Sequence, residues 1–161
     1  MAATATQQVI HNGPRNFVAK YTIGGTTGDT AKGTLVDASA IDSTLGDDAL
    51  RLEKAEWVLT GFSCNLQWDG GPDVDLIELN SGFGRLDFSD IGGIKNNATD
   101  QSGDVVFTTT NYTASGNGGH ILLEFKKRAR IGFAGAGLGG DIEVSTGSLT
   151  LAGQDADRTV A

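Results

Sequence analysis

Phe62-Ser63-Cys64-Asn65-Leu66-Gln67-Trp68 is the stretch that decides the fold. Phe62, Cys64, Leu66 and Trp68 occupy every second position, and the residues between them are polar. Because successive side chains point to opposite faces of a strand, this pattern predicts a strand with one buried face and one face in water. Burial on one side is typical of antiparallel sheets. We therefore expect Trp68 in the core and interpret Cys64 as a buried, inert thiol.

The same alternation recurs on both sides of this stretch. The Gly/Pro/Asp loop at Asp69–Asp73 leads to a second strand at Val74–Leu79, and the two strands predict a hairpin. Asp47–Trp57 reads as a strand, with one helical turn as the alternative. Further strands are expected at Arg15–Ile23, Thr34–Val36, Gly84–Phe88, Val105–Thr108 and Ile121–Phe125. About eight strands separated by turn signals indicate an all-β fold, an antiparallel β-sandwich of the jelly-roll kind.

The sequence suggests three segments. Residues 1–8 are expected to be a flexible N-terminal arm, residues 9–128 the β-sandwich domain, and residues 129–161 a C-terminal extension outside the main core. Glycine stands at nearly every second position from Gly132 to Gly140. Such a segment is suited to adding a strand to the sheet of a neighbour.

The charge balance bears on possible partners. The formal net charge is −8, and an acidic surface repels phosphate, so we predict no nucleic-acid partner and no membrane partner. The start of the chain has no basic and apolar pattern of a signal peptide. A single cysteine cannot form an internal disulfide, which fits a reducing compartment of synthesis.

No motif of the sequence points to chemistry. Gly135–Gly140 has the spelling G-x-G-x-x-G, but a β-branched segment follows where a dinucleotide site needs a helix. Asp69, Asp73 and Asp75 lack the spacing of a calcium loop. The two histidines and one cysteine make a poor zinc set. We therefore predict a non-enzymatic protein with no catalytic residue, no metal site and no cofactor.

Two features are candidates for contact with other proteins. Trp57 lies on the opposite face of its strand from Glu56 and Val58, and aromatic residues are enriched at interfaces. The segment from Lys126 to Arg130 is the only basic cluster, and it is either a solvated strand end or a patch that meets an acidic partner. The candidate interface residues are Trp57, Lys126, Lys127, Arg128 and Arg130.

An ordered set of short stretches resembles a group of small structural proteins of tailed bacteriophages, especially marine ones. The stretches, spread over roughly residues 9–127, are Gly13-Pro14-Arg15-Asn16-Phe17-Val18, Leu66-Gln67-Trp68-Asp69, Leu86-Asp87-Phe88-Ser89, Gly92-Gly93-Ile94, Asn96-Asn97-Ala98, Gly103-Asp104-Val105-Val106-Phe107-Thr108 and Ile121-Leu122-Leu123-Glu124-Phe125-Lys126-Lys127. The resemblance implies a virion component, most like a capsid decoration (cement) protein on the capsid surface that clamps subunits of the major capsid protein. The threefold positions of a capsid lattice favour a homotrimer.

Two alternatives stay open at this point. One is a structural protein of the tail or of a head fibre, which the sequence does not distinguish from a cement protein. The other is a carbohydrate-binding β-sandwich module, which requires an exposed row of aromatic side chains on one sheet. The inward position expected for Trp68 argues against such a row.

Overall fold

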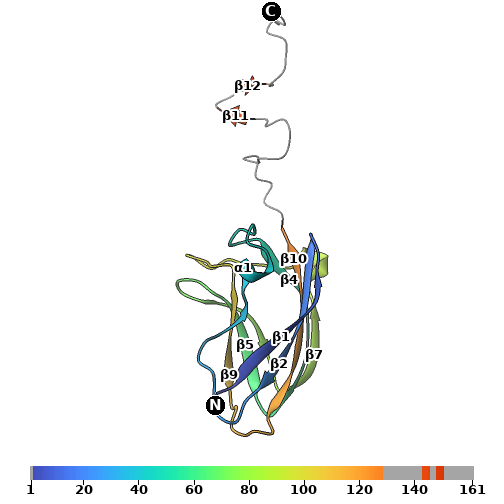
Figure 1. Ribbon diagram of the computed structural model, residues 1–161, viewed down its shortest axis with the longest axis vertical. Coiled ribbons are helices and arrows are strands. Elements are labelled where there is room, and N and C mark those ends of the chain that lie inside the picture. The colour runs from blue at the N-terminus through green and yellow to red at the C-terminus, as the bar shows by residue number, and fades with distance from the viewer. Residues whose placement is uncertain (1, 129–142, 146–147, 151–161) are drawn as a thin grey trace, which may run out of the picture. The chain divides into compact units, whose positions relative to one another are not determined.

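The computed structural model describes residues 2–128, 143–145 and 148–150. The chain divides between Ala129 and Arg130 into two compact units. The first unit is an antiparallel β-sandwich in which two sheets face each other (Figure 1). The all-β sandwich predicted from the alternating pattern is therefore confirmed.

The larger sheet, called sheet A, has the strand order β1-β2-β10-β4-β7, and β8 also pairs with β4. All of its pairs are antiparallel. Its strands are β1 (Thr4–Asn12), β2 (Asn16–Gly24), β4 (Leu50–Thr60), β7 (Gly82–Asp87), β8 (Ile94–Lys95) and β10 (Gly118–Lys127).

The smaller sheet, called sheet B, has the order β3-β9-β5-β6. Its strands are β3 (Gly33–Val36), β5 (Ser63–Trp68), β6 (Val74–Leu79) and β9 (Val105–Thr110). Helical structure in this unit is limited to α1 (Ala38–Ile41) and the 3-10 turn η1 (Ser89–Ile91). Among the described residues, no helix is long and apolar enough to cross a membrane.

The core lies between the two sheets. In β5, Cys64, Leu66 and Trp68 are buried, and the polar residues between them are not, as the alternation predicts. The Trp68 ring meets the Phe125 ring of β10 edge-on, with centroids 6.3 Å apart, so this contact joins sheet B to sheet A. Burial of such large side chains is the main favourable contribution to folding.

The N-terminal segment is not the arm that the sequence suggests. Thr4–Gln8 pair with Gly24–Lys20, so these residues form part of β1 at the edge of sheet A. Ala3 is buried, and its N–H donates to Gly28 O at 3.1 Å. Backbone hydrogen bonds to β2 hold this segment in the sheet. A pattern of apolar side chains cannot predict such bonds, because every residue type except proline can form them.

The strand expected at Asp47–Trp57 is confirmed as β4, which begins at Leu50 and runs on to Thr60. In the second unit, β11 (Glu143–Ser145) pairs with β12 (Ser148–Thr150) in an antiparallel hairpin. The remainder of the expected extension, including the glycine-rich stretch from Gly132 to Gly140, lies outside the described residues.

Candidate functional site

The two outward-facing surfaces of the sandwich differ in character. On sheet B, Asn65 and Gln67 of β5 point away from the core, and each side-chain amide donates to Asp75 Oδ1 at 2.8 Å. Thr108 of β9, the cross-strand partner of Asn65, continues this polar row. These polar groups already hydrogen-bond to one another. A partner that covered them would therefore gain little binding free energy.

Sheet A presents apolar side chains to water. Phe83 of β7 is 87% exposed, Ile10 of β1 is 57% exposed and Val58 of β4 is 55% exposed. Phe83 and Val58 are direct cross-strand partners, so they form one continuous apolar surface. Single exposed apolar residues are ordinary on a protein surface, but a group of them on one sheet face marks an interaction site.

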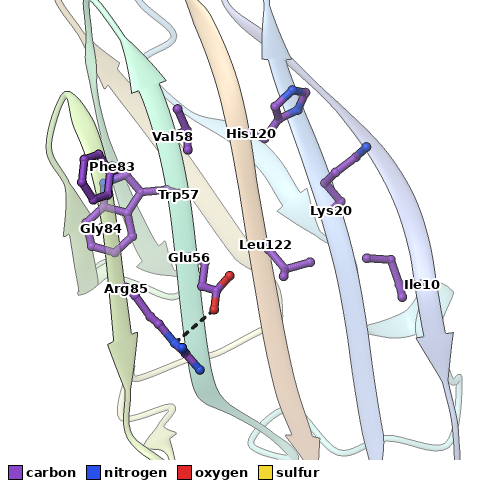
Figure 2. A pocket seen from close by; sticks show the side chains of 10 residues that line it. All are labelled: Ile10, Lys20, Glu56, Trp57, Val58, Phe83, Gly84, Arg85, His120 and Leu122. Atoms are coloured by element: carbon purple, nitrogen blue, oxygen red, sulfur yellow. Dashed lines mark ion pairs between the residues drawn. The ribbon is translucent and has the colours of Figure 1, made fainter.

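These side chains line a hollow of about 690 Å³ on the outer face of sheet A. Figure 2 shows its lining side chains spread over β7, β4, β10, β2 and β1. One cross-strand row runs from Lys20 through Leu122 and Glu56 to Arg85, and the next passes through His120, Val58 and Phe83. We call this surface the apolar hollow; its lining residues are Ile10, Lys20, Glu56, Trp57, Val58, Phe83, Gly84, Arg85, His120 and Leu122.

A few polar groups stand among the apolar ones. Arg85 Nε lies 3.0 Å from Glu56 Oε1, and both side chains are well exposed. His120 Nδ1 lies 3.2 Å from Thr22 Oγ1. An exposed ion pair adds little stability by itself, but it supplies charges of both signs that can orient a partner.

Trp57 enters the hollow from its edge. The residue lies on the side of β4 that carries buried Ala55 and Leu59, opposite Glu56 and Val58. Its ring covers Gly84, since a Cβ atom at Gly84 would lie 2.2 Å from Trp57 Cζ2. The indole N–H donates to Asn80 O at 3.0 Å. Trp57 is therefore a fixed wall of the hollow and only partly a surface residue.

The basic cluster does not behave as one patch. Lys126 and Arg128 are exposed, but Lys127 is buried, with 7% of its surface accessible. Lys127 Nζ donates to Asn12 Oδ1 at 2.5 Å. This placement corrects the expectation for Lys127, because strand alternation turns it inward between two outward neighbours. Arg130 lies outside the described residues.

Sequence reasoning had not singled out Phe83 or the residues around it. A usable signal exists at Gly84–Phe88, where Leu86 is the inward residue and parity assigns Phe83 and Arg85 to the opposite face. His120 and Val58 become neighbours only through the pairing of β10 with β4, which the sequence does not specify. The apolar hollow is therefore a product of strand order.

The single cysteine, Cys64, lies in the core and away from this face. Burial raises the pKa of the Cys64 thiol to about 12, and its side chain faces the core as the alternation predicts. Among the residues that the structure describes, no three His, Cys, Asp or Glu side chains gather in a way that could hold a metal ion.

Comparisons with known proteins identify no relative by sequence. No protein-family model and no curated protein matches the chain. A cupin-domain structure from Bordetella pertussis Tohama I shares 13% identity at a TM-score of 0.31, over 78% of this chain and 94% of that one. A family 11 carbohydrate-binding module from Clostridium thermocellum, solved with a β-1,3-1,4-mixed-linked tetrasaccharide, shares 14% identity at a TM-score of 0.27, over 78% of this chain and 84% of that one. Likeness at these values carries no argument about function.

Proposed function

We propose that the protein is a non-enzymatic docking protein that binds another protein through the outer face of sheet A. The observation that carries this proposal is the exposure of Phe83, Ile10 and Val58 around one hollow. Water contact with apolar surface costs roughly 25 cal/mol per Å², and a partner that covers the hollow removes that cost. An aromatic residue beside an arginine, as at Phe83 and Arg85, is also the composition of an interface hot spot.

The sequence resemblance supports the choice of partner. The stretches that resemble small structural proteins of tailed phages favour a capsid decoration (cement) protein that binds the major capsid protein on the outside of the shell. Many copies that each bury a standard interface of about 800 Å² per partner would strengthen a shell through multivalency. A homotrimer on the threefold positions of the lattice is part of the proposal.

The test compares two variants that remove similar apolar groups from opposite faces of sheet A. Phe83→Ser alters the hollow, whereas Val9→Ser alters a residue that is 51% exposed and pairs with buried Ala19 on the inner side. In co-sedimentation with capsid shells purified without this protein, Phe83→Ser should weaken binding at least about tenfold. Val9→Ser should bind as wild type does. Equal binding by all three proteins contradicts docking through this face.

A carbohydrate-binding module is the second candidate, because the rings of Phe83 and Trp57 line the same hollow as Glu56 and His120. Aromatic rings stack on sugars and polar side chains bond sugar hydroxyls. A glycan array separates the two ideas. Binding of a glycan that Phe83→Ser abolishes, together with no binding to shells, would replace the docking proposal. A role in the tail or in a head fibre is distinguished by the position of the chain in the particle.

A further inference from the structure

Four cations gather at one end of the outer face of sheet A, and three of them form one cross-strand row. Arg51 of β4 is the direct cross-strand partner of Lys95 in β8 and of Lys126 in β10. Arg128 follows β10 directly, and its backbone N–H donates to Ala49 O at 2.7 Å, which holds it beside the start of β4. Like charges directly opposite each other destabilise a sheet, so this row is unfavourable in the free protein.

The chain itself neutralises this row only weakly. Lys126 Nζ lies 4.0 Å from Glu53 Oε1, at the limit of an ion pair. Within the described part of the chain, no ion pair involves Arg51, Lys95 or Arg128. Arg51 Nε is buried and has no hydrogen-bond partner there. A buried donor without an acceptor is costly, and an anion at this place would relieve that cost.

Arg51, Lys126 and Arg128, but not Lys95, line a second, smaller hollow. A space of about 290 Å³ is lined by Arg51, Gly92, Lys126 and Arg128, and we call it the cationic hollow. Gly92 and Gly93 both have positive φ, at 78° and 85°, which favours glycine. A Cβ atom at Gly93 would lie 3.0 Å from Arg51 Cβ, so glycine lets this loop run close against the arginine. The rim of the hollow is therefore formed by backbone held in place beside Arg51.

We infer that the cationic hollow is a binding site for the carboxylate side chains of an acidic peptide segment. A guanidinium group such as that of Arg51 matches a carboxylate with paired hydrogen bonds. The chain as a whole is acidic, with a formal net charge of −8, which disfavours approach of a long phosphodiester chain. A short acidic segment needs to meet only this one patch.

The position of the cationic hollow adds detail to the proposed docking function. The inference that the acidic segment belongs to the docking partner rests on that proposed function. Leu122 of the apolar hollow and Lys126 of the cationic hollow lie four residues apart on the outer side of β10. Strand geometry separates them by about 13 Å. The partner that fits both hollows presents an apolar side chain and a group of carboxylates at that spacing.

The test uses hexaglutamate peptide as the probe and isothermal titration calorimetry at low salt. Wild-type protein should bind the peptide, and Lys126→Gln and Arg51→Gln should each weaken binding about tenfold, the effect of one charge-assisted contact. Lys32→Gln is the matched control, since it removes the same charge from an exposed lysine that pairs with Asp69 and Asp73. That control should bind the peptide as wild type does. Circular dichroism confirms that each variant is folded.

Three results would overturn the inference: no binding of hexaglutamate to wild type, equal weakening by Lys32→Gln, or tighter binding of a single-stranded oligonucleotide than of the peptide. The outcome is separable from that of the docking function. Peptide binding without shell binding rejects the docking partner and keeps the cationic hollow. Shell binding that depends on Phe83, with no peptide binding, rejects the cationic hollow and keeps the docking face.

Discussion

The contact between Trp57 and Gly84 allows a quantitative prediction about the wall of the apolar hollow. In Gly84→Ala the new Cβ atom would lie 2.2 Å from Trp57 Cζ2 and 2.6 Å from Cη2. Carbon atoms in contact are ordinarily about 3.5–4.0 Å apart, so the indole must move by more than about 1 Å. That movement also strains or breaks the bond from Trp57 Nε1 to Asn80 O.

We expect Gly84→Ala to lower the free energy of unfolding by about 2–4 kcal/mol. Overpacking accounts for about 1–3 kcal/mol of this loss and the hydrogen bond for about 1 kcal/mol. In a Trp57→Ala background the obstacle is gone, so Gly84→Ala should be neutral or stabilise by up to about 1 kcal/mol, because alanine restricts the unfolded chain. The two substitutions should therefore be coupled by about 2–5 kcal/mol.

Urea unfolding followed by far-UV circular dichroism measures all four members of this cycle. Gly24→Ala is the control, because a Cβ atom at Gly24 meets nothing within 4 Å, and it should leave the midpoint nearly unchanged. If Gly84→Ala costs the same free energy with and without the indole, the ring does not lie on Gly84 and the description of the wall is wrong.

Three further predictions concern the interior and the charges. Burial raises the pKa of Cys64 from 9.0 to about 12, so its stabilising contribution is present below pH 9 and is lost as the pH rises toward 12. Relative to Cys64→Ala, the unfolding free energy of wild type should fall by up to about 4 kcal/mol over that range in urea titrations, and a constant difference contradicts this. Hydrogen bonds from Lys32 and Ser102 lower the pKa of Asp69, so this contribution is present above pH 3.8 and is lost as the pH falls. Lys32→Gln should therefore lower the urea midpoint at pH 7 but not near pH 2, whereas an equal loss at both values refutes the pairing. Asn12→Ala leaves the buried ammonium of Lys127 without its acceptor and should cost about 1–3 kcal/mol, seen as a lower thermal midpoint; an unchanged midpoint shows that the bond is dispensable.

Strand alternation predicted the interior of this protein because burial acts on each residue separately. Phe62–Trp68 shows this directly, since each apolar member faces the core and each polar residue between them does not. The same reasoning failed at Thr4–Gln8, where polar residues join the sheet through backbone bonds to β2. The parity of a polar strand carries no information about whether it is paired.

The sequence could not predict which side chains meet on the outer face of sheet A, and the reason is different. Arg51, Lys95 and Lys126 are far apart in the chain and come together through the pairing of β8 and β10 with β4. Phe83 and Val58 likewise meet through the pairing of β7 with β4. Strand order depends on the whole set of pairings, so a site assembled across five strands becomes visible only in the structure.

Trp57 shows both what strand parity predicts and what only the structure reveals. Its parity, opposite Glu56 and Val58, follows from the sequence, but parity alone leaves open whether the inner side is covered at that point. The structure places it beside the edge strand β7, where the ring is half-buried against Gly84. Its role as a wall of the hollow depends on that edge position.

Because the proposed function places the chain on a phage capsid, a cryo-electron microscopy reconstruction of that particle is the decisive measurement. We expect density for the β-sandwich on the outside of the shell, with Phe83 and Val58 of sheet A turned toward the major capsid protein and the polar row of Asn65 and Gln67 turned away. Density for the chain in the tail, or on the shell with sheet B against the capsid, would contradict it.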